Sequence, residues 1–244
     1  MKNVALIIPC YNESEDISRK LEILKQYLND NPIDYSFDIV LVNDGSKDNT
    51  EEVINSLKEA RVHALSYTPN KGKGNAVKTG LKYALNELKS DYMIFMDADL
   101  STDLKAIKPC LDILEEGIDI ALASRHDKES NIAIKQPFKR RFISKCSRII
   151  ISSMFHFKVK DTQCGFKGLN RDIVEIIINK TKMERFSFDV EYLYIAKLNK
   201  KTYKSFPVTW SDDRTSTVYP LKSSIRFFKD LFKIKRNKKS YLVK

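Results

Sequence analysis

The chain has 244 residues, of which 42% are hydrophobic and 31% charged, and its formal net charge is +11. This composition is typical of a globular protein and excludes disordered and collagen-like chains. No stretch approaches the roughly 18 to 20 uncharged apolar residues that a membrane-spanning helix needs. The apolar run that follows Lys2 is too short for the core of a signal peptide. We therefore expect a cytoplasmic protein that is made without export.

The positive charge is concentrated in two segments. Residues 131–160 contain eight Lys or Arg and no acidic residue, and residues 220–244 contain nine against Asp230 alone. The rest of the chain carries 26 basic and 31 acidic residues. Such patches favour an anionic partner, namely nucleic acid, phospholipid headgroups or a phosphorylated substrate, and the alternative is that they are solvated helix faces.

The first half of the chain alternates strand and helix patterns. Apolar runs predict strands, and apolar residues at helical spacing predict helices between them. The predicted strands are 4–8, 37–42, 62–67, 92–96 and 118–123, and the predicted helices are 17–28, 48–60, 74–88 and 102–115. The helix 48–60 opens on a sequence that resembles a capping box. This alternation indicates an α/β fold with a parallel sheet, whose ligand loops follow the carboxyl ends of the strands.

The second half is less regular. Residues 138–157 are predicted to form a basic amphipathic helix, and residues 225–232 a second amphipathic stripe. The other predicted elements are strands at 164–169 and 204–210 and helices at 171–179 and 189–198. Residues 233–244 are expected to be a basic tail, for which disorder is one interpretation. The four cysteines have no CxxC spacing and the three histidines no metal-ligand pattern, so we expect reduced thiols and no zinc site.

Two aspartates end the strand predicted at 92–96. Residues i and i+2 of a strand point to the same face, so Asp97 and Asp99 of the motif Asp97-Ala98-Asp99 should converge. Two converging carboxylates repel each other, and a hard divalent cation such as Mg²⁺ or Mn²⁺ relieves that repulsion while bridging to substrate phosphates. The alternative is a helix N-cap beside a solvated aspartate, since the motif alone is a common chance match.

Three polar turns accompany this motif. Segments 9–13 (Pro-Cys-Tyr-Asn-Glu) and 42–46 (Val-Asn-Asp-Gly-Ser) follow the first two strands and could reach a base and a ribose, although such residues are also ordinary in turns. Segment 70–75 (Asn-Lys-Gly-Lys-Gly-Asn) opens a helix and fits neither the Walker pattern nor GxGxxG. A helix N-terminus with two lysines still attracts anions.

In their order and spacing, these motifs together resemble glycosyltransferase family 2, which has the GT-A nucleotide-diphospho-sugar transferase fold. Segments 161–167 (Asp-Thr-Gln-Cys-Gly-Phe-Lys) and 188–191 (Phe-Asp-Val-Glu) look like the branch of dolichyl-phosphate β-glucosyltransferases, dolichol-phosphate mannose synthases and bacterial polyprenyl-phosphate sugar transferases. The resemblance covers residues 4 to about 220. It implies a catalytic domain over 1–220, with a nucleotide-sugar-binding half (1–124) and an acceptor half (125–220). A basic amphipathic helix and tail (221–244) would follow that domain.

The resemblance implies an inverting transfer of a hexose from a nucleoside diphosphate sugar, with glucose from UDP-glucose as the leading candidate. Asp97 and the catalytic Asp99 would hold Mg²⁺ or Mn²⁺ against the diphosphate. Mannose synthases of the branch have Gln where Ser101 stands, which leaves the third metal ligand open. The other residues expected at the nucleotide sugar are Asp44, at the nucleoside, and Pro9, Tyr11, Glu13, Lys73 and Ala98.

The acceptor separates two hypotheses. A polyprenyl phosphate is mostly dianionic at pH 7, because its second pKa is about 6, so it needs cations rather than a base. A hydroxyl on a glycan or on a lipid-linked saccharide would instead need a general base, and the resemblance implies Asp189 for that role. For the phosphate acceptor the resemblance implies Arg125 as a catalytic residue, with further contacts from Arg140, Arg141, Gln163 and Arg214. Arg140 and Arg141 have membrane or solvent contact as their alternative.

A polyprenyl phosphate lies in a membrane, so the two basic amphipathic segments are expected to dock peripherally on the anionic cytoplasmic face of a membrane. The alternative is that both apolar stripes pack on the sheet. Nucleic-acid binding is the competing class, but no RNP, zinc-finger or helix-turn-helix pattern supports it, and no nucleic-acid partner is expected. A sugar nucleotidylyltransferase would begin with a Gly-rich loop bearing Arg, where this chain has the turn at 9–13.

Overall fold

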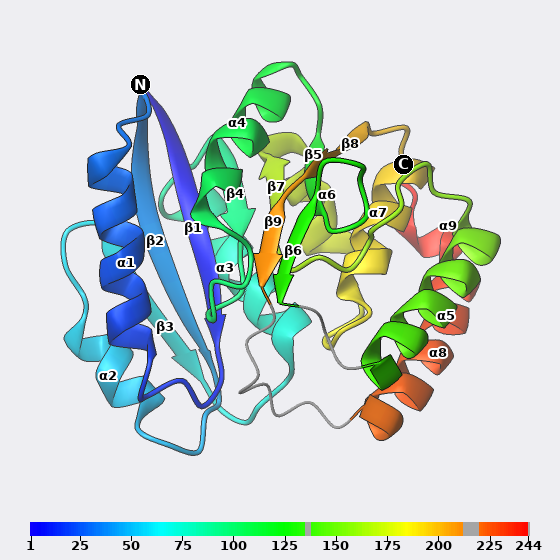
Figure 1. Cartoon of the computed structure of the whole chain (residues 1–244), viewed down its shortest axis with the longest axis horizontal. Coiled ribbons are helices and arrows are strands. Elements are labelled where there is room, and N and C mark those ends of the chain that lie inside the picture. Colours follow the sequence, from blue (N-terminus) through cyan, green and yellow to red (C-terminus); the bar gives the residue numbers. More distant parts are fainter. Residues whose placement is uncertain (135–137, 212–219, 244) are drawn as a thin grey trace.

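The computed structural model describes residues 1–134, 138–211 and 220–243, without the side chains of residues 138–140, 142 and 220–224. Among these residues, seven strands form one sheet in the order β3-β2-β1-β4-β7-β5-β8, with helices on both of its faces (Figure 1). The strands are β1 (Lys2–Cys10), β2 (Tyr35–Asp44), β3 (Val62–Tyr67), β4 (Tyr92–Phe95), β5 (Ile120–Ser124), β7 (Lys167–Asn170) and β8 (Tyr203–Pro207). Within this sheet β7 runs antiparallel to both of its neighbours, and the other pairs are parallel.

The alternation predicted for the first half is confirmed. The helices are α1 (Ile17–Asp30), α2 (Thr50–Ser56), α3 (Lys73–Asn86) and α4 (Ile107–Glu115), the last preceded by a 3₁₀ turn, η1 (Leu104–Ala106). Along β1 successive side chains are buried on opposite faces of the sheet: Leu6 packs in the layer of α1 and α4, and Ile7 in the layer of α3. This burial on both faces explains why the strand sequences are continuously apolar.

The helix predicted at 48–60 is shorter than expected, and the capping-box interpretation is wrong. The N-cap residue of α2 is Asn49, whose side chain makes no capping bond. Asp48 instead accepts a hydrogen bond from the backbone N–H of Thr50 at 3.1 Å, and its other oxygen accepts from the Ser14 hydroxyl at 2.7 Å. Asp48 therefore forms a local turn that holds the segment after β1, because a short carboxylate bonds the backbone two residues on.

In the second half, helices α5 (Phe138–Phe155), α6 (Arg171–Lys180) and α7 (Phe188–Leu198) confirm the prediction. The single strand expected at 204–210 is two strands, β8 and β9 (Thr209–Ser211), since Pro207 has no N–H with which to continue the ladder. Strand β6 (Asn131–Ile134) was not predicted, and it pairs in parallel with β9 as a separate ribbon. The described cysteines Cys10, Cys110, Cys146 and Cys164 are all free, as expected.

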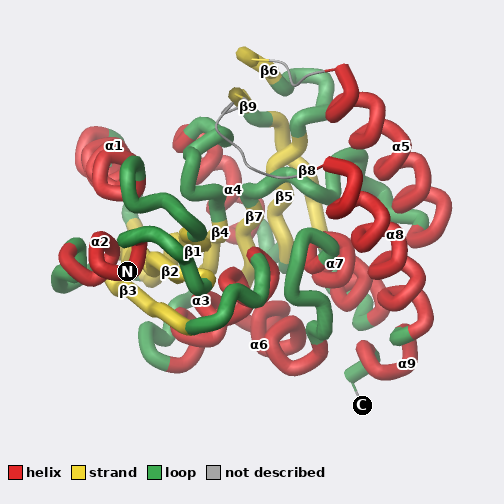
Figure 2. The backbone as a smooth tube through the Cα atoms, turned by 90° about the horizontal axis from the view of Figure 1, so that it is seen from below, coloured by secondary structure: helices red, strands yellow, loops and turns green. Residues whose placement is uncertain are grey.

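The basic C-terminal segment has a fixed structure. Helices α8 (Pro220–Arg236) and α9 (Lys238–Tyr241) lie beside α5 and α7 at one side of the molecule (Figures 1 and 2). The interpretation of residues 233–244 as disordered is wrong for the described part, because Tyr241 is fully buried. Its hydroxyl donates to Glu191 at 2.5 Å, and Asn199 donates to its carbonyl oxygen at 2.9 Å. A buried aromatic ring with a satisfied hydroxyl anchors this segment.

Helices α5 and α8 each have two apolar rows. Ile151 on α5 and Leu231 on α8 are buried in the core. Ile149 on α5 and Phe232 on α8 are instead 60% and 68% exposed. One row of each helix therefore packs inward and the other faces solvent, and docking of the outer rows on a membrane stays a prediction. Among the described residues, no helix has an apolar stretch long enough to cross a bilayer.

Replacing Tyr241 with Phe is expected to lower the free energy of unfolding by about 1–3 kcal/mol, because Glu191 loses a hydrogen-bond donor inside the protein. Burial already raises the pKa of Glu191. Urea unfolding measures the effect. The matched control is Tyr192→Phe, since the Tyr192 hydroxyl is buried without a partner among the described residues and its removal should be neutral or stabilising. Equal losses in the two variants would contradict an anchoring role for Tyr241.

Candidate active site

Asp97 and Asp99 follow β4 at its carboxyl end, and both carboxylates have partners. Lys73, the first residue of α3, forms an ion pair with Asp97. Asp99 accepts hydrogen bonds from the backbone N–H of Ser101 at 2.8 Å and from the Ser101 hydroxyl. Burial and the negative charge of Asp97 raise the pKa of Asp99. A carboxylate whose ionisation is disfavoured by a neighbouring negative charge forms with that neighbour a site to which a cation would bind favourably.

Gly165 packs directly against Asp97. A Cβ atom at Gly165 would lie 1.8 Å from Oδ2 of Asp97 and 2.4 Å from its Cγ, so only glycine leaves room for this carboxylate. Gly165 belongs to the loop 161–166, which leads into β7 beside β4. The predictions named both segments but did not foresee that they meet. The signal that could have indicated this contact is the glycine itself, because a glycine in a loop often marks a place where another part of the chain comes close.

The two aspartates fit a divalent metal, although they do not complete its coordination. In the described parts of the chain, no group of three or more His, Cys, Asp or Glu side chains is placed to hold a metal ion. Mg²⁺ and Mn²⁺ commonly bind through one or two carboxylates together with substrate phosphates and water. Ser101 directs its hydroxyl to Asp99. Ser101, which stands at the position of the third metal ligand in mannose synthases, therefore orients the carboxylate of Asp99.

Asp44 holds the loop that precedes Lys73. It is 3% exposed, and its carboxylate accepts hydrogen bonds from the Tyr67 hydroxyl at 2.7 Å, the Asn70 amide at 2.9 Å and the Gly72 N–H at 2.9 Å. Its side chain thereby fixes where α3 begins and where Lys73 points. Its contact with a nucleoside stays a prediction.

The other residues expected at the nucleotide sugar lie around the ends of β1 and β4. Tyr11 is 40% exposed, and Ala98 is buried. Pro9 and Glu13 are half-buried, and the N–H of Glu13 donates to the Thr50 hydroxyl at 2.8 Å. The turn after β1 is therefore held against the start of α2, with the Tyr11 ring open to solvent.

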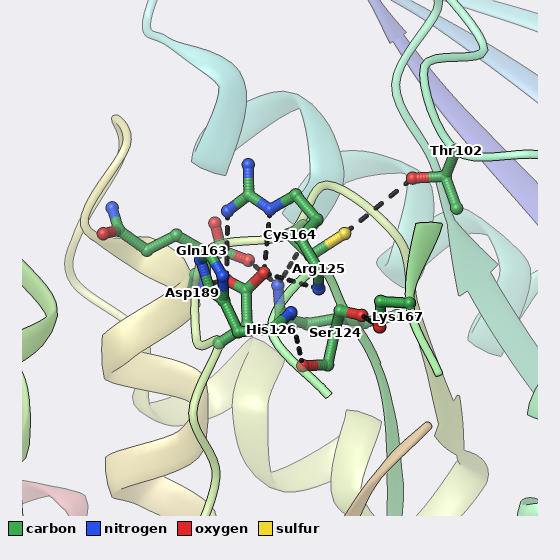
Figure 3. A network of polar contacts seen from close by, with 10 residues as sticks. Thr102, Ser124, Arg125, His126, Gln163, Cys164, Lys167 and Asp189 are labelled. Carbon is green, nitrogen blue, oxygen red and sulfur yellow. Dashed lines mark hydrogen bonds and ion pairs between the residues drawn. The ribbon is translucent and has the colours of Figure 1, made fainter. Parts of the chain in front are cut away.

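Arg125, directly after β5, is held by Asp161. Its Nε and Nη2 donate to the two carboxylate oxygens of Asp161 at 2.8 and 3.0 Å, and its backbone N–H donates at 3.0 Å (Figure 3). Its guanidinium carbon lies 5.5 Å from the centre of the Trp210 ring. Burial alone would raise the pKa of Asp161, but the Arg125 charge outweighs it and holds that pKa below its usual range. A bidentate pair of this kind fixes the orientation of the guanidinium.

The low pKa of Asp161 predicts an acid-sensitive stability. A carboxyl whose pKa is depressed by folding stabilises the protein above its unfolded pKa of about 3.9, and that contribution is lost as the pH falls toward the folded value. Asp161→Asn should therefore be less stable than wild type at pH 7 and should lose less stability between about pH 5 and pH 2. Urea unfolding across this range tests the sign. Asp172→Asn, whose side chain is 76% exposed in the wild type, is the control and should follow the wild-type curve.

Asp189 forms a buried ion pair with Lys167. The Lys167 ammonium donates to Asp189 at 2.6 Å, and the two side chains are only 1% and 8% exposed. Burial raises the pKa of Asp189, against the attraction of Lys167. The Lys167 ammonium also donates to the carbonyl oxygen of Cys164 at 2.5 Å. Asp189 was predicted from the sequence and its partner was not, and the general-base role of Asp189 stays a prediction.

Of the other residues predicted to contact the acceptor, the structure describes only Gln163 near Arg125. Gln163 is half-buried beside the Arg125–Asp161 pair, and its N–H donates to Asp161 at 3.1 Å (Figure 3). Arg141 is exposed on α5. Arg140 lies on α5 with its side chain outside the described part, and Arg214 lies outside the described residues. Their contacts with an acceptor stay predictions.

Charged side chains from both predicted halves of the chain form one cluster, which consists of Lys73, Asp97, Asp99, Arg125, Lys167 and Asp189. Lys73 interacts electrostatically with Asp97 and with Asp189. Burial alone would lower the pKa of Lys73, but the attraction of the two carboxylates outweighs burial and raises this pKa. Asp97 also interacts with Arg125. Carboxylates that follow β4 and lie on α7 are thus paired with cations at the start of α3, after β5 and on β7. This arrangement suits a ligand that brings both a metal ion and phosphate groups.

A family model described as Glycosyl transferase family 2 matches residues 5–177, more than half of the chain. The chain therefore belongs to glycosyl transferase family 2 and is a glycosyltransferase. Among its relatives is the dolichyl-phosphate beta-glucosyltransferase of Dictyostelium discoideum, 30% identical over 244 residues, which cover 95% of this chain and 73% of that protein. The human dolichyl-phosphate beta-glucosyltransferase is 28% identical over 261 residues, covering 96% and 75%.

Solved structures support the same fold. Glucosyl-3-phosphoglycerate synthase from Mycobacterium tuberculosis, in complex with Mn²⁺, UDP and phosphoglyceric acid, has a TM-score of 0.68 at 15% identity. The match covers 97% of this chain and 78% of that one. A complex of the same enzyme with Mn²⁺, UDP-glucose and phosphoglyceric acid also gives a TM-score of 0.68. The GT-A fold that the sequence motifs implied is confirmed.

Proposed function

We propose that this chain transfers glucose from UDP-glucose to dolichyl phosphate, or to another polyprenyl phosphate, with inversion at the sugar. The names of its relatives support this substrate pair. The observation that carries the proposal is that Asp97, which pairs with Lys73 and interacts electrostatically with Arg125, lies beside Asp99 after β4. One side of the cluster suits a diphosphate with its metal, and the other suits an acceptor phosphate.

For the donor, we propose that Asp97 and Asp99 hold Mg²⁺ or Mn²⁺ against the diphosphate. A divalent ion there would neutralise the charge that builds on the leaving diphosphate. Lys73 pairs with Asp97 in this structure, and a diphosphate next to the two aspartates would compete for its ammonium. Gly165 has no side chain, so the carboxylate of Asp97 can occupy its position beside the loop 161–166. Tyr11 and the turn after β1 are left to contact the nucleoside.

For the acceptor, we propose that a phosphate oxygen attacks the anomeric carbon from the face opposite the diphosphate. The new carbon–oxygen bond forms as the bond to the diphosphate breaks, and UDP leaves. The acceptor dianion needs no base, so the protein only has to hold it, and we assign this role to the Arg125 guanidinium. The pair with Asp161 orients the Arg125 guanidinium and shares its charge, so that Arg125 can position a phosphate without neutralising it fully.

The second hypothesis, a hydroxyl acceptor with Asp189 as general base, has a weaker physical basis. Asp189 is 5% exposed, and its carboxylate pairs with the Lys167 ammonium. To take a proton from a substrate, it would have to release that ammonium inside the protein. Leaving a buried charge unpaired costs several kcal/mol.

We propose that the outer rows of α5 and α8 dock on the anionic cytoplasmic face of a membrane. Ile149, Ile225 and Phe232 are 60–68% exposed on these two helices, among exposed basic residues such as Arg226 and Lys233. Apolar side chains that insert at the headgroup level, with lysines and arginines around them, are typical of interfacial helices. This docking would hold the chain at the surface in which a lipid phosphate lies.

One assay tests the proposed reaction. The purified chain is incubated with polyprenyl phosphate and a panel of radiolabelled nucleotide sugars, with Mn²⁺, with Mg²⁺ or with a chelator. We expect lipid-extractable sugar from UDP-glucose when a metal is present and none with the chelator. Product formed in the presence of the chelator would contradict the proposed metal dependence. A clear preference for another nucleotide sugar would contradict UDP-glucose as the donor.

A further inference from the structure

An open cavity of about 700 Å³ lies between α5 and the segment that follows it, residues 156–162. Its lining contains four basic residues and no carboxylate: Lys145, Arg148, Lys158 and Lys160, with His156 and the hydroxyl residues Ser152, Ser153 and Thr162 as the other polar residues. Among the described residues, none of its lysines nor its arginine has a carboxylate within ion-pair distance. Four like charges around one hollow repel each other, so the cavity would be stabilised by an anion.

Two polar atoms at this cavity lack partners. Thr162 is 4% exposed, and neither its hydroxyl nor the buried Nε of Arg148 has a hydrogen-bond partner among the described residues. Buried polar groups in folded proteins are nearly always satisfied, and an exception points to a missing ligand or solvent molecule. Both atoms belong to residues that line the cavity, and a hydroxyl and a guanidinium are donors of the kind that phosphate oxygens accept.

The negative end of α5 is covered by other cations. The carbonyl oxygens of the last turn of a helix carry partial negative charge, which would repel an anion nearby. Lys197 donates to the carbonyl oxygens of Phe155 and His156, both at 2.8 Å, and Lys235 donates to that of Met154. The lysines of the cavity are therefore not needed to satisfy the end of the helix.

The cavity is separate from the cations of the proposed reaction. The guanidinium of Arg125 is directed to Asp161, and Lys73 is paired with Asp97. Thr162 follows Asp161 in the chain, so the lining of the cavity adjoins the partner of Arg125 in sequence. Ile149, exposed on α5, lies at the cavity as well.

We propose that this cavity is a second anion site, which binds a phosphate monoester. The excess of four positive charges favours a dianion over a diester with a single charge. The same chemistry is present in the headgroup of a lipid phosphomonoester and in free inorganic phosphate. The site does not depend on the proposed transfer, since its residues are distinct from the cluster at Asp97.

The test uses the full chain without any donor sugar, so that a failed transfer reaction leaves its result unaffected. Arg148→Ala combined with Lys160→Ala is compared with Lys58→Ala combined with Lys82→Ala, which removes the same charge from exposed positions after α2 and on α3. Thr162→Val removes only the unpartnered hydroxyl. One arm measures thermal stabilisation by inorganic phosphate at constant ionic strength. The other measures flotation with phosphatidylcholine vesicles that contain phosphatidic acid, or phosphatidylserine at equal surface charge.

Wild type and the control pair should bind phosphate in at least one arm, and the Arg148/Lys160 variant should bind about tenfold more weakly or not at all. A thermal shift with inorganic phosphate supports free phosphate as the ligand, and a preference for phosphatidic acid supports a lipid headgroup. Thr162→Val should weaken binding less strongly. The proposal would be overturned by saturable binding in neither arm, or by equal losses in the cavity variant and the control pair.

Discussion

Replacing Gly165 with Ala is expected to lower kcat/KM for sugar transfer about 100-fold or more while the protein stays folded. The added Cβ would lie 1.8 Å from Oδ2 of Asp97, and the contact is made with the far end of a side chain. The carboxylate can therefore rotate away at little cost to the fold, but it then leaves the place where it would meet a metal ion. The measurement is Mn²⁺-dependent binding of UDP together with the transfer rate.

Gly168→Ala is the matched control for this variant. A Cβ at Gly168 would meet the sulfur of Cys110 at 2.3 Å and Leu114 at 3.0 Å, both in the core and away from the aspartates. Overpacking of this kind costs about 1–3 kcal/mol of stability and leaves the site unchanged. We expect the control to unfold earlier with donor binding intact, and Gly165→Ala to show the reverse. Normal Mn²⁺-dependent UDP binding by Gly165→Ala would contradict a metal role for Asp97.

Replacing Asp189 with Asn is expected to lower the free energy of unfolding by about 3–5 kcal/mol, because Lys167 would keep a buried charge without its partner. Transfer per folded molecule should fall less than about tenfold, since a phosphate acceptor needs no base. Chemical unfolding measures the first effect, and transfer below the unfolding transition measures the second. The double variant Lys167→Met with Asp189→Leu should recover part of the lost stability.

An exposed pair provides the comparison for the buried one. Lys108 and Asp112 form an ion pair on α4 with side chains 58% and 54% exposed, and Asp112→Asn should cost no more than about 1 kcal/mol. The two hypotheses for the acceptor make opposite demands on Asp189. Full stability of Asp189→Asn with transfer abolished and donor binding retained would identify Asp189 as a general base and would contradict the phosphate-acceptor proposal.

Local sequence patterns predicted most of the sheet. The apolar run at 62–67 coincides with β3, and Tyr92 begins β4 as expected, because strands buried on both faces are recognisable without knowledge of their neighbours. Strand β6 was missed because its residues are largely exposed and lack a buried face. The end of the chain was misread, since basic composition hides Tyr241, a single buried anchor among lysines.

The candidate site was predictable only in part. Asp97 and Asp99 were named from the two-residue period of a strand predicted at 92–96, but β4 ends at Phe95 and both aspartates lie in the turn after it, so this local reason was wrong. The contact of Gly165 with Asp97 depends on β7 running antiparallel beside β4, and no local pattern reveals that pairing. The same applies to Lys167 and Asp189, which lie 22 residues apart in sequence and meet only through the fold. Pairing across elements is set by tertiary packing, so single residues could be named but not their partners.

The most direct test of the proposed function offers the wild-type chain a choice of acceptors. UDP-glucose and the metal are supplied with dolichyl phosphate, with dolichol, and with a lipid-linked saccharide that has free hydroxyls but no phosphate monoester, and the products are analysed by lipid extraction and mass. We expect a glucosyl phosphate linked to dolichol, acid-labile and of inverted configuration, from dolichyl phosphate alone. Glucose on a saccharide hydroxyl, with dolichyl phosphate unmodified, would contradict the proposal.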